Sequence, residues 1–273
     1  MNSYRPSQVM PPVVKGLLII NVIMFLATYT FQKYGIDLVN LLGLHFPGSV
    51  YFHPYQIVTH MFMHGGIDHI LFNMLALWMF GSLLENVWGP KRFLFFYLFS
   101  GLGSVVLHLT ITGIEVNHLQ SMVNALALHP NPGAFDMLMT KYSNLFDGSF
   151  SAQVSQLTAD YNAQPTDPVL AHQAVEMAQS LVAAFKDVPV IGASGAIFGL
   201  LVAFGMLFPN QYVYVYFFIP VKAKYFVIFY GLIELYLGIS GNEPGVAHFA
   251  HLGGALFGFL LVIYWNKTRH DFY

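Results

Sequence analysis

Residues 188–210 read VPVIGASGAIFGLLVAFGMLFPN and contain no Asp, Glu, Lys or Arg. A helix needs about 17–25 apolar residues to cross the hydrocarbon of a bilayer. The Pro209-Asn210 pair is a turn signal, so we expect the helix to cover residues 191–208 and a loop to follow it. The stretch therefore predicts a membrane-spanning helix that opens with small residues around Ser194.

The whole chain shares this apolar character. Of its 273 residues, 11 are Lys or Arg and 13 are Asp or Glu, so 9% are charged, where a soluble globular domain has about 25%. The net charge of −2 and the lack of a basic tract exclude a nucleic-acid binder. The mean hydropathy of +0.58 excludes an ordinary soluble enzyme and a disordered chain. The absence of cysteine excludes disulfides and thiolate chemistry. A polytopic membrane protein remains.

Further apolar stretches predict five more spans. We expect six helices, at residues 15–33, 56–86, 91–113, 191–208, 224–241 and 246–266. The first is expected to be a retained helix, because no small-residue cleavage site follows it. Residues 34–54 are expected to form a loop at the membrane surface. The expected fold class is all-α, a polytopic bundle of six transmembrane helices.

The basic residues predict the orientation of the bundle. Cytoplasmic loops of membrane proteins carry an excess of Lys and Arg. Six spans place both termini on one side, and that side has eight basic residues: Arg5, Lys15, Lys91, Arg92, Lys222, Lys224, Lys267 and Arg269. The other side has three: Lys33, Lys141 and Lys186. Both termini are therefore predicted to be cytoplasmic, and we expect a bacterial-type plasma (inner) membrane.

One segment differs from the rest in composition. Residues 115–187 contain seven of the thirteen acidic residues and two of the eleven basic ones. Turn signals separate amphipathic helical stretches in it, one with Val154, Leu157 and Tyr161 on one face. The predicted organisation is transmembrane helices 1–3 in residues 1–114, an extracytoplasmic helical insert in 115–187, and transmembrane helices 4–6 in 188–273.

The segment Gly192-Ala193-Ser194-Gly195 is the first candidate for chemistry. Small residues beside a serine let a substrate backbone approach the hydroxyl, and a helix N-terminus offers N–H groups to an oxyanion. Gly and Ser are also common packing residues between membrane helices, so this motif alone leaves both interpretations open.

The second candidate opens the sixth helix, where residues 247–254 read AHFAHLGG. A serine needs a base to become a nucleophile, and imidazole is the usual one. Histidine within a span is costly and is therefore a functional candidate. The alternative is a helix-end histidine that faces water, which suits His248 better than His251. Glu234, in the fifth helix, is expected either to pair with a neighbouring polar group or to mark a water-filled cavity.

The third candidate is the run from His60 to Asn73, HMFMHGGIDHILFN. His69 and Asn73 are four residues apart and share a helix face, where both can donate hydrogen bonds to an oxyanion. Asn73 is equally suited to join two helices. A metal site at His60 and His64 is a weaker interpretation, because the run lacks the HExxH pattern of zinc peptidases.

Their depth in the membrane and the glycine spacing of their helices bring these candidates together. The second, fourth and sixth helices all run inward, and about 1.5 Å of rise per residue places His69, Ser194 and His251 at similar depth in the outer leaflet. The fourth and sixth helices also contain small residues four apart, Gly195-x-x-x-Gly199 and Gly254-x-x-x-Gly258. Such pairs let two backbones approach closely, which a Ser–His hydrogen bond requires.

The motifs HGGIDHILFN, GASGAIFG and AHLGGALFG resemble those of the rhomboid family of intramembrane serine proteases. The resemblance covers most of the chain outside 115–187. It implies that Ser194 is the nucleophile, that His251 is its base, and that His69 and Asn73 line the oxyanion hole with the Ser194 N–H. It also implies that Phe198 packs under His251, and that the fold is the rhomboid-like six-helix bundle.

The resulting hypothesis is a serine endopeptidase that cleaves transmembrane or juxtamembrane segments of membrane proteins. We find no acid placed to orient His251, so we expect a Ser–His dyad. The loop near residues 241–246 is a candidate cap over the site. We expect a membrane-protein substrate and the lipid bilayer as partners, no nucleic acid, no cofactor and no metal; the oligomeric state is left open. The alternatives are a catalytically inactive rhomboid-like protein that binds membrane-protein clients, and a proton-relay transporter, which the lack of paired broken helices disfavours.

Overall fold

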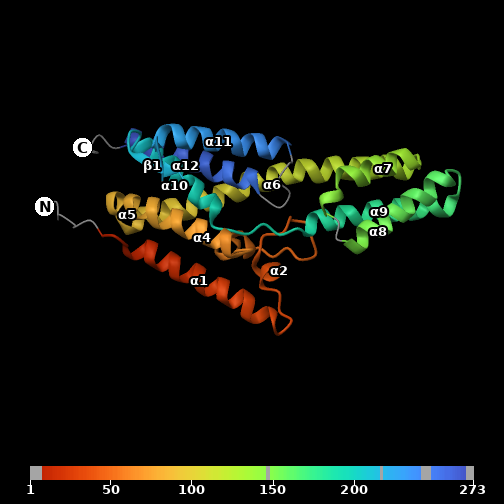
Figure 1. Ribbon diagram of the computed structural model, residues 1–273, viewed down its shortest axis with the longest axis horizontal. Coiled ribbons are helices and arrows are strands. Elements are labelled where there is room, and N and C mark those ends of the chain that lie inside the picture. Colours follow the sequence, from red (N-terminus) through yellow and green to blue (C-terminus); the bar gives the residue numbers. More distant parts are fainter. Residues whose placement is uncertain (1–7, 146–147, 216–217, 241–246, 269–273) are drawn as a thin grey trace. The chain divides into compact units, whose positions relative to one another are not determined.

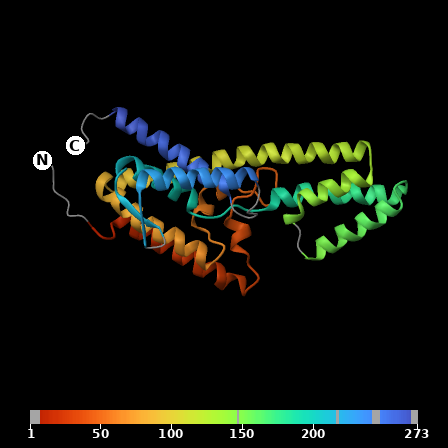
Figure 2. The same ribbon diagram turned by 45° about the horizontal axis from the view of Figure 1, so that its top comes forward.

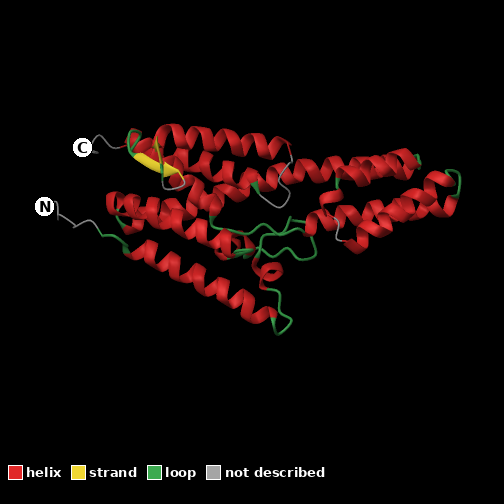
Figure 3. Cartoon of the chain, viewed as in Figure 1, coloured by secondary structure: helices red, strands yellow, loops and turns green. Residues whose placement is uncertain are grey.

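The computed structural model describes residues 8–145, 148–215, 218–240 and 247–268, and most of them are helical (Figures 1 and 3). The α-helices are α1 (Pro12–Gln32), α2 (Leu38–Leu42), α3 (Gln56–Thr59), α4 (Ile67–Ala76), α5 (Ser82–Trp88), α6 (Pro90–Leu128), α7 (Pro132–Lys141), α8 (Gly148–Ala163), α9 (Pro168–Asp187), α10 (Ser194–Leu207), α11 (Ala223–Ser240) and α12 (His248–Thr268). Short 3₁₀ turns are η1 (His60–Phe62) and η3 (Ser143–Leu145), and η2 (Leu77–Gly81) is a π-helical stretch between α4 and α5.

The chain divides into two compact units. One takes the described residues within Met1–Leu44, His53–Leu109 and Pro189–Tyr273, and the other takes His45–Phe52 and Thr110–Val188. The first unit contains the candidate residues for chemistry. The boundaries predicted for the insert, 115–187, and its extracytoplasmic location stay predictions.

Five of the described helical stretches are long and apolar enough to cross a membrane. They are Pro12–Gln32, Ile67–Trp88, Pro90–Leu128, Ala223–Ser240 and His248–Lys267. The sixth apolar helix, α10, has only 14 residues, which gives it a length of about 21 Å. Large apolar side chains on α11, such as Phe229 and Ile233, are exposed, as expected for a helix that faces lipid. The predicted all-α, polytopic fold is confirmed.

The second span begins later than predicted. The sequence indicated one helix over residues 56–86, but the chain forms α3 and η1 first, breaks, and starts the long helix at Ile67. Gly66 is in a fully extended conformation, with φ −174° and ψ 171°. Glycine is a poor helix residue, and the Gly65-Gly66 pair separates the two segments. The prediction of one continuous helix from residue 56 was therefore wrong.

The third span and the segment after the fourth also differ from the prediction. The third was expected to end at residue 113, but α6 continues to Leu128, because polar side chains alone do not end a helix and the next breaker is Pro130. The segment expected to be only a loop after residue 208 contains a hairpin, in which β1 (Tyr212–Val215) pairs antiparallel with β2 (Ile219–Lys222). Residues 34–54 contain the short helix α2.

The second unit has its own apolar core. The last part of α6 packs with α7, α8 and α9 around buried residues such as Leu119, Phe135 and Leu181. The face predicted from spacing is confirmed, because Val154 and Leu157 are each 8% exposed and Tyr161 is fully buried. This unit is therefore a helical bundle stabilised by apolar burial.

The first unit is organised around α10. Ten of the fourteen residues of α10 are buried, and α12, α11 and α4 all contact it. The views in Figures 1 and 2 both show α10 beside α12. A helix that is apolar on every side lies either in a protein core or in lipid, and the buried residues of α10 show that its neighbours surround it. This central position fixes the start of α10, where Ser194 lies.

A buried carboxylate holds the start of α1. Glu85 of α5 is 2% exposed, and its two oxygens accept hydrogen bonds from the backbone N–H groups of Val13 and Val14 at 3.0 and 2.8 Å. The first N–H groups of a helix have no acceptor within the helix, and negative charge near them is favourable. Glu85 therefore acts as a cap provided by another helix.

We expect Glu85→Ala to lower the free energy of unfolding by about 1–3 kcal/mol, because it leaves two buried donors without an acceptor. Glu85→Gln should cost less, since the amide oxygen can still accept one of the bonds. The measurement is the thermal unfolding midpoint in detergent. An unchanged midpoint for Glu85→Ala would contradict this role.

Candidate active site

Ser194 is the first residue of α10, and the chain reaches it through a tight turn. Gly192 has φ +126°, a conformation that side chains other than glycine rarely adopt. Its N–H donates to the carbonyl oxygen of His60 at 2.9 Å, which attaches the turn to the segment before α4. The Ser194 side chain is half-buried, and the helix begins immediately after Ala193. The hydroxyl thus lies beside N–H groups that have no acceptor within the helix.

His251 lies in the first turn of α12 and contacts Ser194 directly. Its Nε2 is 2.8 Å from Ser194 Oγ, within hydrogen-bond range. Its ring stacks on Phe198, with centroids 4.4 Å apart and the planes within 6°. Phe198 is one turn after Ser194 on α10, so the same helix supplies the hydroxyl and the surface that supports the imidazole. The predicted Phe198 contact is confirmed.

The predicted glycine groove between α10 and α12 is also present. A Cβ added to Gly254 would overlap the backbone carbonyl of Gly195, and one added to Gly258 would lie 2.8 Å from the Cα of Gly199. A Cβ on Gly199 would lie 3.1 Å from the carbonyl oxygen of Gly254. The two backbones are therefore too close to accommodate side chains at these positions. This close approach lets the short serine side chain reach the imidazole.

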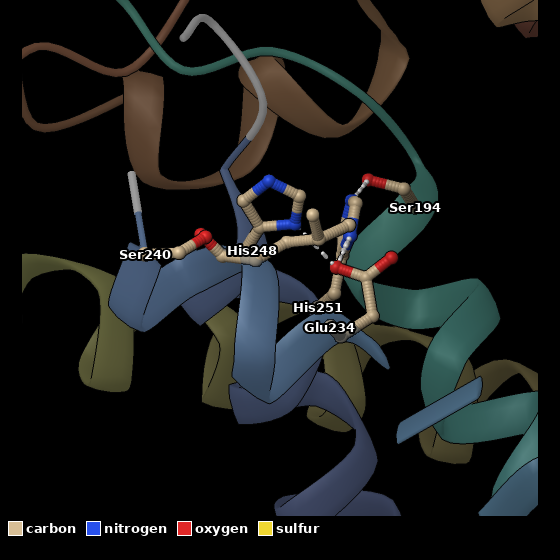
Figure 4. A network of polar contacts seen from close by, with 6 residues as sticks. Ser194, Glu234, Ser240, His248 and His251 are labelled. Atoms are coloured by element: carbon tan, nitrogen blue, oxygen red, sulfur yellow. Dashed lines mark hydrogen bonds and ion pairs between the residues drawn. The ribbon is translucent and has the colours of Figure 1, made fainter. Parts of the chain in front are cut away.

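Glu234 of α11 completes the network around His251 (Figure 4). Its Oε2 is 2.9 Å from His251 Nδ1 and 2.7 Å from His248 Nδ1. The expectation that no acid orients His251 was therefore wrong. Pairing with a polar neighbour was one of the two options for Glu234, and it is the one observed.

His248 is placed differently from its predicted position. The sequence makes a water-facing helix end the better alternative for His248 than for His251, but His248 is 5% exposed and its Nδ1 forms a hydrogen bond with Glu234. The sequence places His248 and Glu234 in apolar helices but does not show that the two side chains face each other. Their only sequence signal is the presence of ionisable groups within a span.

His69 of α4 borders the turn that precedes Ser194. A Cβ added to Gly192 would lie 2.8 Å from His69 Nε2 and 3.5 Å from Ser194 Oγ, so the imidazole and the hydroxyl flank the same small space. Asn73 lies one turn further along α4 and is 7% exposed. Its Nδ2 donates to the backbone oxygen of His69 at 2.8 Å, and an amide has a second hydrogen to donate.

The histidines before α4 have other surroundings. His60 is buried, and its Nδ1 is 2.9 Å from the backbone oxygen of Gln56, so this nitrogen carries the hydrogen. The His64 ring lies edge-on to His69, with centroids 5.0 Å apart. In the described part of the chain, the group of three side chains with ligand atoms close enough for a metal ion is Glu234, His248 and His251, and it includes neither His60 nor His64. The candidate cap at 241–246 lies outside the described residues.

Comparison with known proteins decides the family. A family model described as the Rhomboid domain matches residues 51–117 and 169–267, which include Ser194, His251, His69, Asn73 and Glu234. The chain belongs to the rhomboid family. The matched ranges contain α4, α10, α11 and all but the last residue of α12, and they omit most of the second unit.

Several curated rhomboid proteins are similar to this chain. An uncharacterised mitochondrial rhomboid protein of Schizosaccharomyces pombe is 26% identical over 78% of this chain and 52% of its own length. RHOMBOID-like protein 12, mitochondrial, of Arabidopsis thaliana is 25% identical over 79% of this chain and 46% of its own length. Rhomboid protease GluP of Bacillus subtilis is 42% identical over 19% of this chain and 10% of its own length. This rhomboid spans about half the length of the two relatives that align over most of it.

Family membership and the long apolar helices together identify an integral membrane protein. The two relatives that align over most of the chain are mitochondrial. They do not support the expected bacterial-type plasma membrane.

Proposed function

We propose that this rhomboid is a serine endopeptidase that cleaves transmembrane or juxtamembrane segments of other membrane proteins through Ser194 and His251. The observation that carries the proposal is the 2.8 Å contact between Ser194 Oγ and His251 Nε2. A hydroxyl within hydrogen-bond reach of an imidazole, at a helix N-terminus, is the arrangement of an activated nucleophile. The alternative of an inactive client-binding protein gives no reason for this contact.

In the first half of the reaction, Ser194 Oγ attacks the scissile carbonyl carbon while its proton moves to His251 Nε2. The C–N bond of the tetrahedral intermediate then breaks, and the leaving amine takes that proton from His251. The product is an ester between Ser194 and the N-terminal part of the substrate. Stacking on Phe198 keeps the imidazole plane aligned during both transfers.

The oxyanion of the intermediate needs preorganised donors. We assign this role to the Ser194 N–H, to the His69 ring and to the second amide hydrogen of Asn73. The Ser194 N–H is at the start of α10, and His69 flanks the same space as the hydroxyl. All these donors are neutral, so they can stabilise the developing charge without placing an isolated cation in the membrane.

In the second half, His251 Nε2 takes a proton from a water molecule whose oxygen attacks the ester. Collapse of the second tetrahedral intermediate breaks the bond to Ser194 Oγ, which takes the proton back from His251. The products are the original hydroxyl and a carboxylic acid, which releases its remaining proton to water and becomes a carboxylate. This chemistry needs no cofactor.

We further propose that both termini are cytoplasmic, so that the residues of the site lie in the outer leaflet and the insert 115–187 lies outside the cytoplasm. The support is the distribution of basic residues, eight on the terminus side and three on the other. Protease added to sealed right-side-out vesicles should cut within 115–187 and spare tags at both ends of the chain. Removal of both tags by the protease would show that the termini lie on the opposite side of the membrane.

The proposed activity is tested with the purified chain in liposomes. We expect it to cleave a model single-span substrate, and to be labelled by a serine-directed fluorophosphonate probe at Ser194. Ser194→Ala should retain its fold and lose the label. A folded wild-type chain that neither cleaves nor reacts would favour the client-binding alternative.

A further inference from the structure

Glu234 is a carboxylate within an apolar membrane helix. Its side chain is 6% exposed, while only 11% of the most apolar part of α11 is buried inside the protein. An ionisable group in a span is costly unless it is paired. Its Oε2 is within hydrogen-bond distance of the Nδ1 atoms of His248 and His251, so Glu234 faces α12, where its partners lie (Figure 4).

The geometry determines which nitrogen of His251 carries the hydrogen. A carboxylate can only accept hydrogen bonds, so the 2.9 Å contact places a hydrogen on His251 Nδ1. In the neutral ring, Nε2 is then the acceptor, and this atom is 2.8 Å from Ser194 Oγ. That tautomer is the one in which His251 can take the hydroxyl proton.

We propose that Glu234 is a positioning residue that makes the site a Ser194–His251–Glu234 triad. This inference rests on the proposed function. When the proton of Ser194 Oγ moves to Nε2, the ring becomes an imidazolium whose charge is next to the Glu234 carboxylate. The proton on Nδ1 stays there, so Glu234 stabilises the cation without becoming protonated. His248 gives Oε2 a second bond, which fixes the carboxylate against rotation.

A structural tie or a metal site would use the same contacts, and each predicts a different result. As a tie, Glu234 would serve only to attach α11 to α12, and its loss would act through stability. As a metal site, the three side chains, whose ligand atoms lie within 4.8 Å of one another, would hold an ion on which activity depends. Cleavage kinetics, the tautomer of His251 and the metal content of the protein distinguish the triad from both.

The central experiment compares Glu234→Ala and Glu234→Gln in the cleavage assay. We expect kcat to fall about 10²-fold or more for Glu234→Ala, because base catalysis contributes about 10²–10⁴-fold. KM should stay within about twofold, since Glu234 touches His251 and not the substrate. Glu234→Gln should fall less than Glu234→Ala, because its amide oxygen can still accept the Nδ1 hydrogens although the charge is lost.

Glu85 provides the matched control. It is also a buried carboxylate in a membrane helix, but its carboxylate accepts hydrogen bonds from backbone N–H groups of α1. Glu85→Gln should lower the unfolding midpoint and leave kcat unchanged. Glu234→Gln should lower kcat at a midpoint at least as high as that of Glu85→Gln. If the kcat values of both variants simply follow their midpoints, Glu234 is a structural tie and the proposal is wrong.

The tautomer of His251 gives a readout that does not depend on cleavage. In protein labelled with ¹⁵N-histidine, the His251 signals can be assigned by difference from His251→Ala. We expect hydrogen on Nδ1 in the wild type, in Ser194→Ala and in Glu234→Gln, and a shift toward Nε2 in Glu234→Ala. An unchanged tautomer in Glu234→Ala overturns the proposal even if the wild type is active. Failure of the wild type to cleave, with the tautomer shift present, counts against the proposed function and not against the role of Glu234 in orienting His251.

Metal analysis of protein purified without chelator completes the test. We expect no stoichiometric divalent ion, and full activity after dialysis against EDTA. One equivalent of ion that disappears in Glu234→Ala, with activity lost in EDTA and restored by Zn²⁺, would replace the triad with a metal site.

Discussion

Replacing Ser194 or His251 with alanine is expected to reduce kcat for cleavage of a single-span substrate by at least about 10³-fold. Ser194→Ala removes the atom that forms the ester. His251→Ala removes the acceptor for its proton, which is 2.8 Å away, and also the ring that stacks on Phe198. Residual cleavage in either variant measures what the oxyanion donors and substrate binding contribute alone. The measurement is the initial rate of product formation in liposomes.

The double variant tells a joint role from two separate ones. Residues that act as one unit have strongly non-additive effects. We therefore expect Ser194→Ala/His251→Ala to be no slower than Ser194→Ala alone. Each protein must retain the wild-type helical circular dichroism signal and elute as the wild type does in detergent. A single variant that is folded and cleaves at more than about a tenth of the wild-type rate would remove that residue from the mechanism.

The fold could be predicted largely because a bilayer imposes a simple rule. In a helical membrane protein, each spanning segment satisfies its own backbone hydrogen bonds and has little charge, so counting charges identified the apolar helices of the bundle. The errors concern helix boundaries, which this rule does not determine. Gly65-Gly66 starts the second helix at Ile67, and the polar residues after 113 continue α6 to Leu128. Both boundaries depend on the local conformational preference of the backbone, which cannot be derived from the length of an apolar stretch.

Depth and glycine spacing brought the candidate residues of the site together, and the resemblance to the rhomboid family gave them their roles. Ser194 and His251 could be placed at one level, and the glycines implied that their helices touch. Glu234 could be placed in α11, but the sequence does not tell which face of α11 meets α12. α11 is apolar on nearly all sides, so no amphipathic pattern marks its inner face. The pairing of Glu234 with His248 and His251 therefore required the structure.

Among substitutions that add one methyl group in the described part of the first unit, Gly254→Ala is expected to reduce stability and activity the most. The added Cβ would overlap the backbone carbonyl of Gly195, and neither backbone can rotate away as a side chain can. The helices must separate, which costs about 1–3 kcal/mol of stability. The same shift lengthens the Ser194–His251 contact, and about 1 Å of misplacement can cost about 10²-fold in rate. Activity should therefore fall well before the protein unfolds.

The matched control is Gly231→Ala in α11, where an added Cβ meets nothing within 4 Å. Alanine is the better helix residue, so this variant should have full activity and an unfolding midpoint at or above that of the wild type. Cleavage rate and midpoint are measured on both proteins in the same detergent. If Gly254→Ala keeps the wild-type rate, the backbones of α10 and α12 can accommodate a methyl group that the structure shows no space for. The close approach of α10 and α12 would then not be the reason that the hydroxyl reaches the imidazole.

Loss of rate in Gly254→Ala at a temperature where it remains folded would show that the packing of the two glycine-rich helices acts on the chemistry directly. The added methyl group lies between the helix that carries Ser194 and the helix that carries its base.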